Sequence, residues 1–125
     1  MSWTSRPTNF SLEVVKKAES QIKKISAEML QQVIVGSPVD TGAFRGNHHI
    51  TLGSPDNAFD LTAVDKDGGT TQQKGNQKIL QAKIGGLIYI QNNLPYAVAL
   101  ENGHSQQMAH GIYSIAFMKV MRKYK

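Results

Sequence analysis

Apolar residues between positions 11 and 35 recur every three or four positions, which places them on one face of a helix. These residues are Val15, Ala18, Ile22, Ile25, Met29 and Val33. Ser11 is a suitable N-cap, because Phe10 before it and Val15 after it have the spacing of a hydrophobic staple. Gly36 and Pro38 are typical of a helix end. The pattern therefore predicts a long N-terminal helix over 11–35.

The β-strand signals are shorter and lie further along the chain. A short strand is predicted at 49–52, and residues 87–90 form a second run of β-formers. Pro95 can begin a short helix over 96–101, and apolar spacing from Ile112 onward predicts a C-terminal helix. The expected fold class is α+β. A long N-terminal helix packs on a small, mostly antiparallel sheet, with a short helix and a C-terminal helix.

Residues 62–78 are the poorest in apolar side chains, with only Ala63 and Val64 in the segment. Asp67 and the two glycines after it are typical of a turn. A polar connection of this length is unusual within a compact domain and is often functional. We expect residues 62–78 to be a long polar loop that becomes ordered in an assembly. Residues 77–84 are compatible with either a short helix or the start of a strand.

Length and composition indicate one small domain. The chain has 125 residues, no cysteine, 40% hydrophobic residues and 18% charged residues. This length predicts a single domain over 1–125, with residues 1–10 as an N-terminal arm. Without cysteine, disulfides, thiolate nucleophiles and cysteine-ligated metals are excluded. No secretory signal or membrane-spanning run is visible, so we expect synthesis in a cytoplasm and no membrane partner.

Positive charge is concentrated in the second half of the chain. Residues 1–67 carry seven basic and eight acidic side chains, whereas residues 68–125 carry seven basic side chains and a single acidic one, Glu101. A basic half-domain can attract nucleic acid, but it is also compatible with an ordinary solvated surface. Four lysines decorate the polar segment and its surroundings without interleaved aromatic residues: Lys66, Lys74, Lys78 and Lys83.

Motifs for catalysis, cofactors and metals are missing from the sequence. The chain has no phosphate-binding loop, no dinucleotide fingerprint and no zinc-protease or serine-hydrolase motif. His104 and His110 match no known ligand spacing, and a base and nucleophile at His104 and Ser105 would share one tight turn. We therefore expect no enzyme activity, no catalytic residues, no metal and no cofactor.

Two segments carry a family resemblance. The run GSPVDTGAFRGN at 36–47 and the run IQNNLPYAVALENGHSQQ at 90–107 resemble, in the same order, two signatures of small proteins of tailed bacteriophages. These are the minor tail proteins of the head–tail joining, or neck and tail-completion, type. With the terminal helix, the resemblance covers about half of the chain. His48 stands where members often have an aromatic residue.

The resemblance implies a non-enzymatic virion protein at the junction between the phage head and tail. Copies of such a protein form a ring, with sixfold symmetry expected because tails are sixfold. Expected partners are the chain itself, a head-closure or connector protein, and a tail-tube or tail-terminator protein. Two alternatives are a tail-terminator ring that caps the tail tube and a stand-alone basic nucleic-acid-binding protein.

The resemblance also implies roles for individual residues. Turn and signature positions are Pro38, Asp40, Thr41, Gly42, Arg45, Asn93, Pro95, Tyr96, Glu101 and Gly103. Arg45 and Glu101 carry opposite charges on the two signatures, and we predict that they pair. In a ring around DNA, the four lysines named above could face the channel. Aromatic anchors for subunit contacts, or else core residues, are Trp3, Phe59 and Tyr124.

Overall fold

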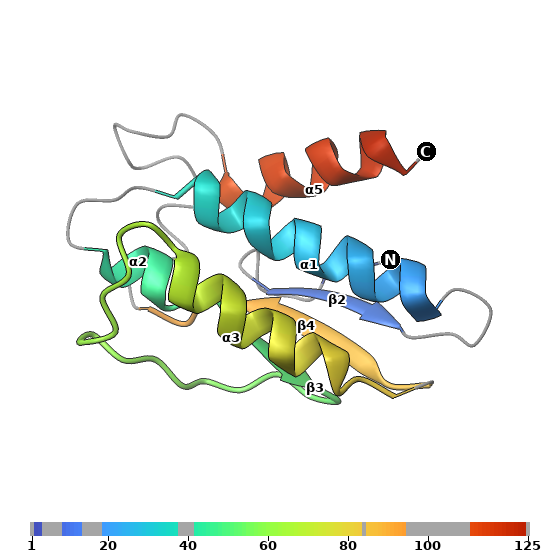
Figure 1. Cartoon of the computed structure of the whole chain (residues 1–125), viewed down its shortest axis with the longest axis horizontal. Coiled ribbons are helices and arrows are strands. Elements are labelled where there is room, and N and C mark those ends of the chain that lie inside the picture. The colour runs from blue at the N-terminus through green and yellow to red at the C-terminus, as the bar shows by residue number, and fades with distance from the viewer. Residues whose placement is uncertain are drawn as a thin grey trace.

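The computed structural model describes residues 2–3, 9–13, 19–37, 42–83, 85–94 and 111–124. Figure 1 shows the arrangement of the helices and strands. In chain order these are β1 Ser2–Trp3, β2 Asn9–Glu13, α1 Glu19–Val35, α2 Ala43–Gly46, β3 His49–Leu52, α3 Gly69–Leu80, β4 Leu87–Gln91 and α5 Ile112–Lys123. The elements form an α+β fold in which a long helix near the N-terminus packs on a small antiparallel sheet.

Among the described residues, the sheet has four strands in the order β1-β2-β4-β3, and every neighbouring pair is antiparallel. β4 lies between β2 and β3, so that Ile90 is opposite Phe10 on one side and Ile50 on the other. β3 is therefore an edge strand of this sheet. The strands predicted at 49–52 and 87–90 are confirmed, and β4 extends one residue further, to Gln91.

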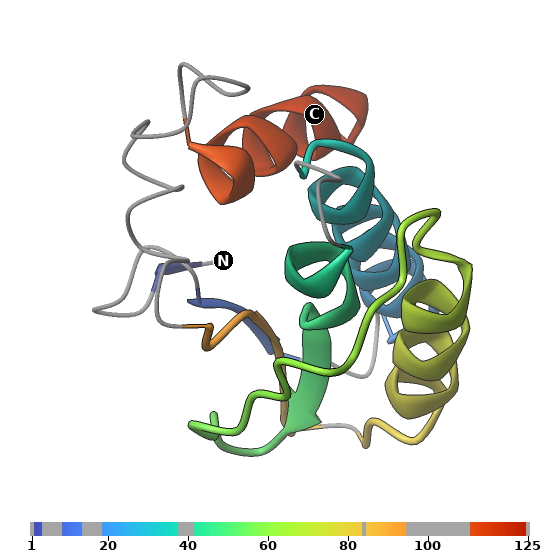
Figure 2. The ribbon, with the colours of Figure 1, turned by 90° about the vertical axis from the view of Figure 1, so that its left-hand side faces the viewer.

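Three helices cover the sheet, and α1 lies between α3 and α5 (Figure 1). Figure 2 shows α1 and α5 above the sheet and α3 beside its β3 end. The apolar core forms where these layers meet, and its most completely buried side chains come from α1, β4 and α5. Among them are Met29, Leu30, Val33, Ile88, Ile90, Ile112 and Tyr113.

The N-terminal boundary predicted for the long helix is wrong. α1 begins at Glu19, whereas residues 9–13 form β2 and Ser11 lies opposite Tyr89 rather than capping a helix. Phe10 and Leu12 alternate with polar residues, which is a strand period as well as part of a helix stripe. Pairing with β4 satisfies backbone groups of that strand that would otherwise lack partners. The expected arm over 1–10 correspondingly contributes β1 and the start of β2.

The prediction of a loop over 62–78 is also wrong for most of that segment, because residues 69–80 form α3. Asp65 Oδ2 accepts hydrogen bonds of 2.7 Å from both the amide and the hydroxyl of Thr71, which satisfies part of the first helical turn. The buried face of α3 consists of Thr71, Gly75 and Ile79. A Cβ on Gly75 would lie 2.1 Å from Leu30 Cδ2, so α3 approaches α1 through a glycine.

Candidate functional site

The two signature segments meet in the folded chain. Asn92, from the second segment, donates a hydrogen bond of 2.9 Å through Nδ2 to the backbone oxygen of Phe44, from the first. The same Nδ2 lies 3.4 Å from His48 Nδ1. Asn92 and His48 are both buried. Segments more than forty residues apart in the sequence thus share one buried polar unit.

His48 is the centre of this unit. The single hydroxyl proton of Ser37 is donated to the carbonyl oxygen of Val33, so the hydrogen bond of 2.7 Å between Ser37 Oγ and His48 Nε2 must use the proton of the ring. His48 Nδ1 then accepts a bond of 3.0 Å from the Tyr113 hydroxyl. Burial, together with electrostatic repulsion from the neighbouring His49 and Arg45, lowers the pKa of His48 to about 3, so the ring is neutral at pH 7. The neutral ring joins the ends of α1, α2 and α5.

Arg45 is held by backbone oxygens. Its Nε, Nη1 and Nη2 donate to the carbonyls of Ser37 at 3.1 Å, Lys66 at 2.9 Å and Val35 at 3.2 Å. Val35 is the last residue of α1, where a cation is favourable to the helix dipole. Glu101, its predicted partner, lies outside the described residues, so that pairing stays a prediction.

Residues 54–63, which we call the strap, form an irregular segment that ends in a turn at 60–63, and side-chain amides of neighbouring elements fix it in place. Asn47 Oδ1 accepts a hydrogen bond of 2.8 Å from the Asp60 amide, and Asn47 Nδ2 donates one of 2.8 Å to the Asp60 carbonyl. Gln91 makes the same two-way contact with the backbone of Asp56, at 3.0 Å and 2.9 Å. The side-chain amides of Asn47 and Gln91 thus satisfy backbone N–H and C=O groups of the strap, as a neighbouring strand would in a sheet.

Asp56 binds further groups at the same place. Its Oδ1 lies 2.8 Å from His49 Nε2 and accepts a hydrogen bond of 2.9 Å from Asn93 Nδ2. Asn93 Nδ2 also contacts the carbonyl of Ala58 at 3.0 Å. Partial burial raises the pKa of Asp56, but the interactions with His49, the Ala58 amide and Asn93 together outweigh it and hold this pKa below its usual range. Asn93, a predicted signature residue, therefore positions the strap.

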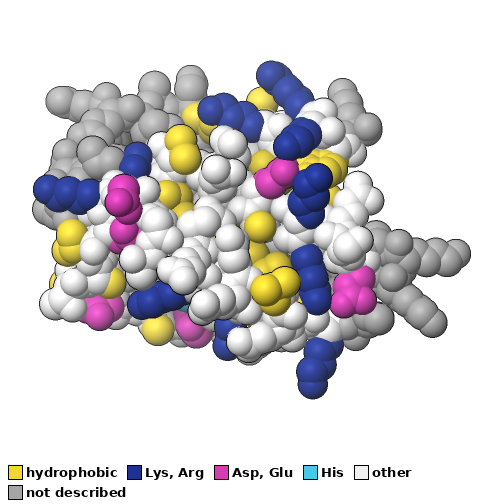
Figure 3. All heavy atoms as spheres, viewed as in Figure 1, with side chains coloured by type: hydrophobic (Ala, Val, Ile, Leu, Met, Phe, Trp, Pro, Cys, Tyr) yellow, Lys and Arg dark blue, Asp and Glu magenta, His cyan; other side chains and the backbone are white. Residues whose placement is uncertain are grey.

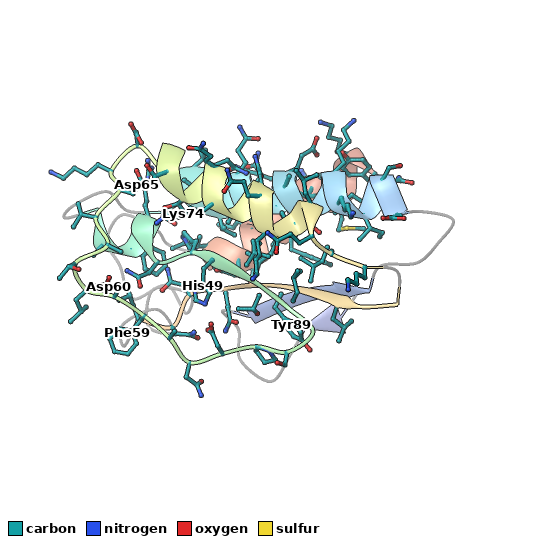
Figure 4. The ribbon with its side chains drawn as sticks, turned by 60° about the horizontal axis from the view of Figure 1, so that its bottom comes forward. His49, Phe59, Asp60, Asp65, Lys74 and Tyr89 are labelled. Carbon is teal, nitrogen blue, oxygen red and sulfur yellow. The ribbon has the colours of Figure 1, made fainter. Side chains whose placement is uncertain are left out.

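A cleft of about 510 Å³ lies between β3, the strap and α3. Figure 4 labels four of the side chains that line it: His49 from β3, Phe59 and Asp60 from the strap, and Lys74 from α3. Its lining includes His49 and Ile50 from β3, Phe59 and Asp60 from the strap, and Lys74, Gly75 and Lys78 from α3. The cleft is therefore partly apolar, with two ammonium groups on one wall.

The four predicted lysines do not form a single patch. Lys74 and Lys78 lie one helical turn apart and line the same cleft. Lys83 lines a separate hollow of about 270 Å³, and Lys66 precedes α3, where Arg45 binds its carbonyl. On the face shown in Figure 3, basic side chains are interspersed with acidic and apolar ones.

The predicted aromatic anchors differ in exposure. Phe59 is 48% exposed at the cleft, whereas Tyr124 is half-buried and packs against the apolar core. The side chain of Trp3, in β1, lies outside the described part of the chain. Among the signature residues, Gly42 has a φ of 80°, in the left-handed region that glycine adopts readily. Outside the described residues lie Pro38, Asp40, Thr41, Pro95, Tyr96, Glu101 and Gly103, together with the predicted helix over 96–101.

The sequence reasoning missed the buried amides and the role of His48. Asn47, Gln91 and Asn92 occupy polar stretches that resemble surface turns. A usable signal was present at the end of β4, where Gln91 closes the strand and Asn92 and Asn93 directly follow it. Polar side chains at the end of a central strand need partners inside the fold.

The described residues contain no group of three acidic or histidine side chains placed to hold a metal ion. None of the described helices has the length and apolar character needed to cross a membrane. No protein-family model, curated protein or solved structure matches the chain.

Proposed function

We propose that this chain is a structural virion protein of a tailed phage, which forms a ring at the head–tail junction and helps join the tail to the head. The observation that carries the proposal is the contact between the two signature segments. The segments that resemble the phage family share the Asn92–Phe44 hydrogen bond and the buried His48. The two resembling segments are in contact, so they support the proposal more strongly than two turns in separate parts of the fold would.

The exposed apolar residues of and beside the strap are a second support. Phe59, Leu61 and Val64 are 48%, 60% and 56% exposed. The backbone from Asp56 to Asp60 is fixed by amide hydrogen bonds, so Phe59 is presented from an ordered segment. Large apolar side chains on a fixed surface are typical of protein contacts, and identical subunits in a ring need complementary faces.

Deletion of the gene from the phage that carries it tests the proposal. Electron microscopy of the lysate should show filled heads and finished tails that are not joined. Addition of the purified protein to that lysate should restore joined particles and plaque formation. Asn92→Ala protein should restore less than Asn57→Ala protein, because Asn92 connects the two signature segments whereas Asn57 is exposed.

The phenotypes of the alternatives differ. A tail-terminator role would give tails of uncontrolled length in the deletion lysate. Normal yields of joined, infectious particles after deletion would contradict any neck or tail-end role.

A further inference from the structure

The outer backbone edge of β3 pairs with none of the strands that the structure describes. The Gly53 amide donates to the Leu87 carbonyl at 2.8 Å, so Gly53 and Leu87 are a hydrogen-bonded pair of the antiparallel ladder. Hydrogen-bonded and non-hydrogen-bonded pairs alternate along such a ladder. His49 and Thr51 then exchange hydrogen bonds with β4, whereas Ile50 and Leu52 direct their N–H and C=O groups away from it. Within the described residues, nothing binds these outward groups of Ile50 and Leu52. An edge of this kind is a template for another strand.

The cleft lies along this edge. Ile50 lines the main cleft of about 510 Å³, and Leu52 lines the separate hollow of about 270 Å³. Figure 4 shows β3 between α3 and the strap. Gly75 of α3 packs close to the side chain of Ile50, since a Cβ there would lie 3.3 Å from Ile50 Cγ1. The opposite wall is held by the amides of Asn47 and Gln91.

The charges in the cleft favour an acidic occupant. Lys74 and Lys78 are exposed on the α3 wall, and neither has an ion pair among the described residues. The facing carboxylate of Asp60 is turned back onto Thr62, with bonds of 2.9 Å to its amide and 2.6 Å to its hydroxyl. Asp56 is likewise bound to His49. The two ammonium groups therefore remain available to carboxylates of a partner.

We propose that an extended, acidic segment of a partner protein binds in this cleft as an added strand on β3. Its backbone pairs with the outward groups of Ile50 and Leu52, and its carboxylates meet Lys74 and Lys78. Main-chain pairing supplies affinity in such strand addition, and side-chain contacts supply specificity. The inference rests on the edge and the charges, and does not depend on the virion role.

Selection of random displayed peptides against the immobilised protein tests the proposal. The enriched peptides should be acidic and extended, and a synthetic copy should shift the amide resonances of Ile50 and Leu52. Replacement of both cleft lysines, Lys74→Gln with Lys78→Gln, should weaken its binding about tenfold. The matched variant Lys24→Gln with Lys119→Gln removes the same charge from α1 and α5 and should leave binding unchanged.

The backbone contribution is tested separately. N-methylation of alternate residues of the peptide should abolish binding in one of the two registers, because it removes the donors that face β3. Leu52→Pro removes an outward N–H without breaking the ladder to β4, and should also weaken binding. If this variant does not fold, the methylated peptides decide the question. Absence of enriched peptides, resonance shifts elsewhere, or duplex DNA as the sole ligand of Lys74 and Lys78 would overturn the proposal.

Discussion

Asn47 and Asp60 exchange two hydrogen bonds of 2.8 Å, one in each direction, between a side-chain amide and a backbone. The side chain of Asn47 is buried and also donates to the Ala43 carbonyl at 2.8 Å. The side chain of Asn47, directly after α2, thus binds the backbone amide and carbonyl of Asp60 as a neighbouring strand would in a sheet.

Asn47→Asp should lower the free energy of unfolding by about 3 kcal/mol, because a buried carboxylate would face two carbonyl oxygens and lose both donated bonds. Urea unfolding at pH 7 measures the change. Asn57→Asp adds the same charge to an exposed position of the strap and should change stability little. Equal effects of the two substitutions would show that the Asn47–Asp60 pairing is energetically unimportant.

His48 makes the protein sensitive to acid. The pKa of His48 is about 3 in the folded chain, against 6.5 for an ordinary histidine. As the pH falls from 6.5 towards 3, the unfolded chain takes up a proton that the folded chain does not, so stability falls. The expected slope from this residue is about 1.4 kcal/mol per pH unit. His48→Gln should be less stable at pH 7 but should lose less stability over this window. Parallel curves for both proteins would contradict the assignment.

Gly46 allows the strap to approach α2. A Cβ at this position would lie 1.9 Å from the carbonyl oxygen of Ala63, a backbone atom that no rotamer change can move. Gly46→Ala should therefore cost about 1–3 kcal/mol, although alanine is the better helix former. Gly69→Ala, in the exposed first turn of α3, serves as the control and should be neutral or stabilising. Thermal unfolding of both variants checks the difference.

Arg45→Lys keeps the charge but loses the planar fork that reaches three carbonyls. We expect a loss of about 2 kcal/mol in unfolding free energy. The predicted pairing with Glu101 can be measured in the same experiments by a double-mutant cycle of Arg45→Met and Glu101→Gln. A coupling energy near zero would show that Arg45 does not pair with Glu101 and acts through its hydrogen bonds to the three carbonyls alone.

Part of the fold could be predicted from the sequence. The whole of α1 lies within the predicted helix, α5 follows from apolar spacing, and the strands at 49–52 and 87–90 follow from β-forming residues bounded by turn signals. α3 was not predicted because its inward face carries Thr71 and Gly75. These residues allow close approach to α1 but give no apolar stripe in the sequence. β2 was not predicted because Phe10 and Leu12 fit both a helical and a strand period. Only the pairing with β4 decides between the two.

The candidate site was located only in part by sequence reasoning. The turn residues marked both signature segments, and Arg45 and Asn93 do bind within the fold. The functions of Asn47 and Gln91 depend on where the strap passes, which local sequence does not specify. A buried amide and a surface amide have the same sequence signature until their partners are known.

The amides of Asn47, Gln91 and Asn93 carry no net charge, and this sets how the protein responds to ionic strength. Counterions screen charged groups and leave neutral hydrogen bonds almost untouched. The strap should therefore keep its position from dilute buffer to molar salt, while an attraction that depends on Lys74 and Lys78 fades. Added salt should thus weaken the proposed binding of an acidic strand without altering the shape of the cleft.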